Sequence, residues 1–122
     1  MRYWTGCIWL SGVTLLLWTS SASAAQRVWI TEFAGLGNVS GGGQAQIANM
    51  PAVARQQVDV TGGVQSSAAF NASTRYIRVV CEVQCAVRGD GTAAATDTLL
   101  PAYFPEYFGV QAGSVISVIA AP

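Results

Sequence analysis

Cys81 and Cys85 are the most chemically distinctive side chains outside the N-terminal region. This spacing could hold a metal ion on a helix, but the chain has no histidine and no second cysteine pair to complete the ligands. On one extended strand their Cα atoms would lie about 13 Å apart, beyond disulfide reach. We therefore expect two buried free thiols, which suit a reducing cytoplasm, or a particle assembled inside one, better than a periplasm.

Acid–base and nucleophilic catalysis have few candidate residues in this chain. The absence of histidine and lysine removes the usual general base and the Ser-Lys pair. The six carboxylates are scattered along the sequence, at Glu32, Asp59, Glu82, Asp90, Asp97 and Glu106. The glycines at 41–43 lack the Lys-Ser or Lys-Thr of a phosphate-binding loop. We expect no enzymatic activity, no cofactor and no metal ion.

Charge is scarce throughout the sequence. Charged residues make up 10% of the 122 residues and the formal net charge is zero, whereas an ordinary soluble domain has roughly 25% charged residues. Nothing in this balance favours capture of nucleic acid. We expect a partner to cover much of the surface, as in a subunit of an assembly. The alternative is a small exported protein rich in glycine and alanine.

Residues 1–24 have the features of a secretory signal. Arg2 provides a weak positive end, Ile8 to Trp18 is largely apolar, and Ala22-Ser23-Ala24 fits a cleavage site. The apolar run is shorter than the about 20 residues that span a membrane, so we expect no stable membrane span in the mature chain. A competing interpretation is that Met1 is a misassigned start and the protein begins near Ala25.

Alternation of apolar and polar side chains dominates the rest of the sequence. Arg75 to Arg88 reads as one long strand, because its odd-numbered residues from Ile77 to Val87 are all apolar. The other predicted strands are Arg27 to Phe33, Val53 to Val60, Val64 to Phe70 and Ser114 to Ala120.

The connections between these strands are also predicted from composition. We expect a flexible loop over 35–43, an edge or connector over 47–51, and a hairpin that joins Val53 to Val60 with Val64 to Phe70. No helical period is present after residue 25. The sequence therefore predicts an all-β domain over 25–122, either a small antiparallel β-sandwich or a partly open barrel, with a separate apolar N-terminal segment.

The segment Leu99 to Val110 combines two prolines with four aromatic residues, which are Tyr103, Phe104, Tyr107 and Phe108. Prolines exclude a central strand, so we expect an aromatic corner with Glu106 exposed. In an extended chain these aromatics would face the same way in pairs four residues apart. A domain of about 98 residues buries only some 60–65% of its surface. The four are therefore interface candidates for self-association, with sugar stacking as an alternative role.

Several segments of the chain form a pattern when they are taken together. They are Arg27 to Phe33, Asn71 to Val79, Cys85 to Val87, Gly89 and Pro105 to Val110 followed by Gly113. This pattern resembles small β-rich structural proteins of tailed bacteriophages, including capsid decoration-like proteins. The resemblance implies a non-enzymatic component of the virion that acts by packing on itself or on other virion proteins. The alternative is an exported bacterial β-sandwich module, secreted or periplasmic if the leader is genuine, that binds a surface glycan or protein.

Val79→Asp is expected to unfold the domain, because Val79 lies in the middle of the predicted dry face. An unpaired buried carboxylate costs several kcal/mol against a total stability of about 5–15 kcal/mol. Thermal unfolding followed by circular dichroism would check this. A soluble variant that melts cooperatively would contradict the predicted burial.

Overall fold

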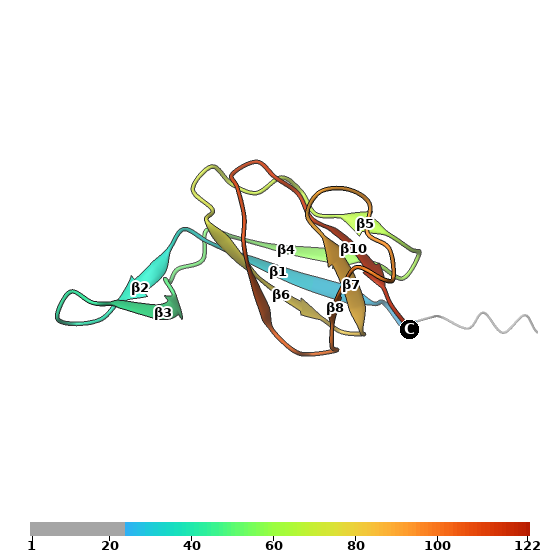
Figure 1. Cartoon of the computed structure of the whole chain (residues 1–122), viewed down its shortest axis with the longest axis horizontal. Coiled ribbons are helices and arrows are strands. Elements are labelled where there is room, and N and C mark those ends of the chain that lie inside the picture. The colour runs from blue at the N-terminus through green and yellow to red at the C-terminus, as the bar shows by residue number, and fades with distance from the viewer. Residues whose placement is uncertain (1–23) are drawn as a thin grey trace, which may run out of the picture.

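The computed structural model describes residues 24–122, which form a two-layer antiparallel β-sandwich (Figure 1). The first sheet contains, in order, β4 (Ala54–Asp59), β1 (Arg27–Phe33), β6 (Tyr76–Cys81) and β9 (Glu106–Gly109). The second contains β5 (Gln65–Ser66), β10 (Ser117–Ala120), β7 (Cys85–Arg88) and β8 (Thr98–Leu100). The all-β prediction is confirmed, and the architecture is an open sandwich, not a closed barrel.

A two-stranded hairpin projects from one end of the sandwich, opposite the C-terminus (Figure 1). It consists of β2 (Leu36–Asn38) and β3 (Gln44–Ala48) and interrupts the connection between β1 and β4. We call residues 34–53, which include this hairpin, the arm.

The core lies between the two sheets and is built from alternate residues of each strand. Val28 and Ile30 of β1 and Ile77 and Val79 of β6 are fully buried. They pack in one cluster with side chains from the second sheet, namely Cys85, Val87, Leu100 and Val118, and with Phe70. The period-two pattern therefore identified the inward residues of β6 and β7 correctly, whereas Val83 in the connection between them is only half-buried.

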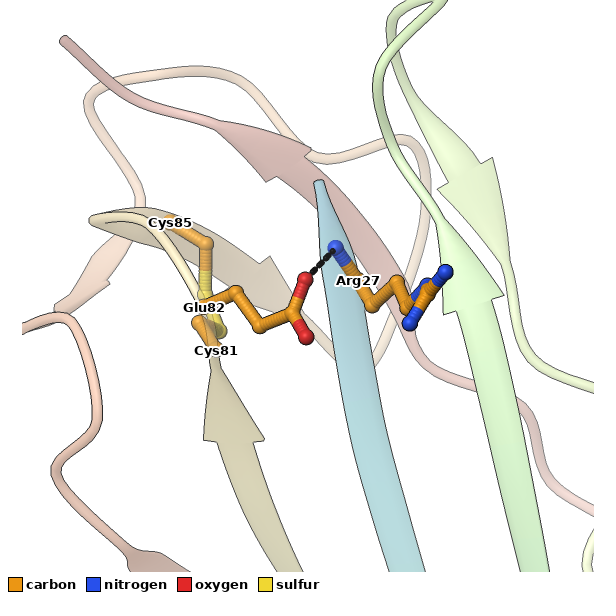
Figure 2. Close-up of a disulfide and its surroundings, with 4 residues drawn as sticks. All are labelled: Arg27, Cys81, Glu82 and Cys85. Atoms are coloured by element: carbon orange, nitrogen blue, oxygen red, sulfur yellow. Dashed lines mark hydrogen bonds between the residues drawn. A yellow bond between two sulfur atoms is a disulfide. The ribbon is translucent and has the colours of Figure 1, made fainter. Parts of the chain in front are cut away.

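The predicted strand from Arg75 to Arg88 is two strands in two different sheets. β6 ends at Cys81 in the first sheet, the chain bends through residues 82–84, and β7 begins at Cys85 in the second sheet. Figure 2 shows the Cys81–Cys85 disulfide across this bend. Glu82 within the bend accepts a hydrogen bond from the backbone N–H of Arg27 at 3.1 Å, which ties the corner to the start of β1.

The prediction of two free thiols is therefore wrong. Because the chain bends, the Cα atoms of Cys81 and Cys85 lie 6.3 Å apart, within the usual range for a disulfide. Both residues are fully buried, as expected. Alternation could not reveal the bend, because a chain that passes from one sheet to the facing sheet keeps directing alternate side chains into the same core.

Two further sequence predictions need correction. The segment Val64 to Phe70 does not form a hairpin with β4, because β5 covers only Gln65–Ser66 and pairs with β10 in the other sheet. The predicted flexible loop over 35–43 contains β2. The proposed leader at 1–24 lies outside the described residues except for Ala24.

Reduction of the Cys81–Cys85 disulfide should destabilise the domain without unfolding it. The bond closes a very short loop and so constrains the unfolded chain only modestly. Its reduction should therefore lower the free energy of unfolding by about 2 kcal/mol. Urea unfolding with and without reductant would measure the difference. The Cys81→Ala/Cys85→Ala double variant is the control and should not respond to reductant. Alkylation of both thiols in the native, unreduced protein would contradict the disulfide.

Candidate interaction surfaces

The connection between β8 and β9 exposes two of the predicted interface aromatics. Tyr103 is 73% exposed and Phe104 is 56% exposed. The backbone N–H of Tyr103 donates to the carbonyl oxygen of Cys81 at 2.7 Å, and that of Phe104 donates to Pro101 at 3.3 Å. Hydrogen bonds therefore hold this turn against the disulfide corner while both rings face solvent. We call residues 101–105 the aromatic turn.

Tyr103 adopts a backbone conformation that is unfavourable for its residue type. Its φ angle is 59°, the only positive φ outside glycine in residues 24–122. The left-handed region costs an L-residue roughly 1–2 kcal/mol because Cβ approaches the following carbonyl oxygen. Tyr103 bears this cost although its ring packs little within the chain.

The other two predicted interface aromatics lie on β9 and point in opposite directions. Tyr107 is 54% exposed on the outside of the first sheet, whereas Phe108 is partly buried and packs against the core. Glu106 was predicted to be exposed at the corner, but it is half-buried. The predicted pairing of aromatics four residues apart also fails, because the aromatic turn is not extended.

The arm is an apolar surface that the sequence analysis did not identify. No charged residue occurs between Glu32 and Arg55. The arm nevertheless exposes four large apolar side chains to solvent, which are Leu36, Val39, Ile47 and Met50. The alternation of Gln46, Ile47 and Ala48 after three glycines was the available signal for a hairpin.

Close packing within the arm depends on one glycine. A Cβ at Gly37 would lie 3.2 Å from Cγ1 of Ile47, tighter than an ordinary contact. Gly37 therefore lets the Ile47 side chain cross the neighbouring strand of the hairpin.

A groove of about 520 Å³ separates the arm from β9. Leu36 and Ile47 line its arm side, and Tyr76 and Tyr107 line its other side. The rings of Tyr76 and Tyr107 lie 6.4 Å apart, and Tyr76 stacks on Phe33 at 5.2 Å. The groove thus joins the apolar arm to a row of aromatic rings on the first sheet.

The interior contains one carboxylate, Glu32, on the inward face of β1. It is fully buried. The Thr74 hydroxyl donates to it at 2.6 Å, the Asn71 backbone N–H at 2.9 Å and the Gln56 side-chain amide at 2.7 Å. Burial by itself raises the pKa of Glu32, but these hydrogen bonds outweigh burial and hold the pKa below its ordinary value of 4.5.

Glu32 is therefore placed to stabilise the fold and not to act as a general acid. A general acid needs a raised pKa and access to a substrate, and Glu32 has neither. Gln56 extends the network, because its side-chain oxygen accepts from the Ala68 backbone N–H at 2.8 Å. Together these contacts attach the crossover segment 68–74 to both β1 and β4.

No group of three or more metal-ligating side chains is present in residues 24–122. Over the same residues, no helix has the length and apolar character needed to cross a membrane.

Comparison of this chain with known protein families, with curated proteins and with solved structures gave no match.

Glu32→Gln should lower the free energy of unfolding by about 1–3 kcal/mol at pH 7. The N–H and O–H groups that now donate to a carboxylate would then face a neutral amide, which accepts weaker hydrogen bonds. The folded pKa of Glu32 is depressed, so its stabilisation is present above pH 4.5 and is lost as the pH falls through the folded value. The difference between wild type and variant should therefore shrink in acid. Urea unfolding between pH 3 and 7 would measure it.

Glu106→Gln is the matched control, because the Glu106 carboxylate accepts no hydrogen bond from the described part of the chain. Parallel stability–pH profiles for wild type and Glu32→Gln would contradict the role assigned to Glu32.

Proposed function

We propose that this protein is a structural subunit of a virion that acts by packing against neighbouring protein subunits. The observation that carries the proposal is the exposed ring of Tyr103 on an unfavourable backbone. Glycine would adopt that backbone without cost, and the ring gains little from its own chain. A tyrosine at this position is explained by a contact outside the chain, since tyrosine is enriched at the centres of protein interfaces.

The distribution of apolar surface supports the same proposal. The aromatic turn lies beside the disulfide corner and the arm projects from one end of the sandwich. A subunit with two different apolar surfaces can bind a second copy head to tail, with the arm of one copy against the aromatic turn of the next. Scarce surface charge removes much of the repulsion that would oppose such contacts.

The virion setting rests on the resemblance between residues 27–120 and phage structural proteins. The Cys81–Cys85 disulfide is compatible with the surface of a released particle, where disulfides persist. The same bond favours the second candidate, an exported module that binds a surface glycan or protein, because a periplasm is also oxidising. The mature N-terminus, determined by mass spectrometry on protein from the native host, separates the two. Cleavage after Ala24 supports export.

Tyr103→Gly should abolish self-association while the domain keeps its fold. The substitution removes the exposed ring and relieves the left-handed backbone, so the free energy of unfolding should stay constant or rise by about 1 kcal/mol. Sedimentation velocity from low to high micromolar concentration would report the oligomeric state.

Val64→Ala is the matched control, because Val64 is an exposed apolar residue between β4 and β5, away from the aromatic turn. It should leave self-association unchanged. A wild-type protein that stays monomeric at high micromolar concentration, or a Tyr103→Gly variant that still associates, would contradict packing through this turn.

A further inference from the structure

The outside of the first sheet carries aromatic rings and arginines in a regular array. Residues that alternate with the buried positions of its strands point away from the core. On this outer side lie Trp29 and Thr31 of β1, Arg55 and Gln57 of β4, Arg78 of β6 and Tyr107 of β9. Trp29 is 42% exposed and Tyr107 is 54% exposed. We call Trp29, Arg55, Arg78 and Tyr107 the aromatic–arginine face.

Strand register fixes the order of these side chains. Thr31 is the direct partner of Arg55 on one side and of Arg78 on the other, and Arg78 is the direct partner of Tyr107. Arg55 and Arg78 are thus two strand positions apart, a spacing of about 10 Å. Thr31 is buried between them. The two arginine side chains therefore lie on either side of the Thr31 position.

The two arginines are exposed and form no ion pair among the described residues. Most of the carboxylates lie away from these two arginines. Glu32 is inside the sandwich, Glu82 lies in the disulfide corner, and Asp90 and Asp97 contact Arg88. Asp59 is on the outer side, but it lies at the end of β4 as the direct partner of a third arginine, Arg27. Glu106 opposes the inward-facing Val79 and so lies on the other side of the sheet. This face is therefore locally cationic on a chain of zero net charge.

The groove beside this face continues the array of rings. Tyr76 lines it together with Tyr107. The Tyr76 hydroxyl is buried and has no hydrogen-bond partner among residues 24–122. Tyr76 therefore contributes the side of its ring, and not its hydroxyl, to the surface of the groove.

We propose that the aromatic–arginine face binds a polysaccharide that contains uronic acids. Sugar rings would stack on Tyr107 and Trp29, and sugar carboxylates would pair with Arg78 and Arg55, whose planar fork matches a carboxylate. The spacing of the arginines is about the span of a disaccharide, so alternate acidic sugars can reach both. This site is separate from the aromatic turn and does not depend on the packing function proposed above.

A single-stranded nucleic acid fits the same face less well. Bases would also stack on its rings, but nucleic acid carries a phosphate at every nucleotide and is held by a continuous basic groove. The face provides two free cations, and the chain has no lysine. A polyanion without rings could pair with Arg55 and Arg78 but could not stack on Trp29 and Tyr107.

Binding of the full chain to alginate oligosaccharides, measured by isothermal titration calorimetry, tests the proposal. Neutral dextran, polyphosphate and oligothymidylate of similar length are the comparison probes. We expect alginate to bind most tightly. Arg78→Gln and Arg55→Gln should each weaken alginate binding about tenfold, and Tyr107→Ala about fivefold.

Arg88→Gln is the charge-matched control and should bind alginate like wild type, because Arg88 lies in the other sheet and pairs with Asp90. Circular dichroism melts would establish that each variant is folded. The proposal is overturned if alginate does not bind, if oligothymidylate or polyphosphate binds more tightly, or if the Arg55 and Arg78 variants bind like wild type. It is also overturned if those two variants alter only the oligomeric state, since the face would then be a protein interface.

Discussion

The passage of the chain from one sheet to the other at Cys81–Cys85 is the constraint on which the rest of the sandwich depends. β6 is an interior strand of the first sheet, and β7 is an interior strand of the second. A bend of three residues joins them, so the disulfide fixes the two layers at one corner. The backbone of Tyr103 bonds to the carbonyl oxygen of Cys81, so the position of the aromatic turn also follows from this corner.

The opposite end of the sandwich has no covalent link and relies on polar contacts. Glu32 gathers donors from β4 and from the crossover segment 68–74 around one buried charge. That segment leads from the second sheet back to β6. Glu32 therefore connects the two sheets at one end of the sandwich, as the disulfide does at the other end. The two devices differ in their response to conditions, because one is sensitive to reductant and the other to acid.

Local patterns in the sequence predicted the class of fold and the inward residues of β6 and β7, because alternation directly encodes burial. They did not predict which strands pair. Val83 and Cys85 continue the alternation through the bend, so one long strand and two strands in facing sheets have the same pattern of apolar and polar residues. The aromatic–arginine face was missed because its residues come from different strands. Arg55, Arg78 and Trp29 are far apart in the sequence, and only strand register brings them together. Tyr103 and Phe104 were identified as interface candidates, but the left-handed turn that holds Tyr103 depends on a distant carbonyl group.

The arm has a consequence for how this chain can diverge. β1 and β4 are direct neighbours, with Glu32 opposite Ala54, so the arm fills what would otherwise be a short hairpin loop. The entropy of closing such a loop grows only with the logarithm of its length. Residues 34–53 can therefore lengthen, shorten or change composition at little thermodynamic cost to the sandwich. The body and the arm can thus evolve at different rates, and one scaffold can acquire different attachments through a single insertion point.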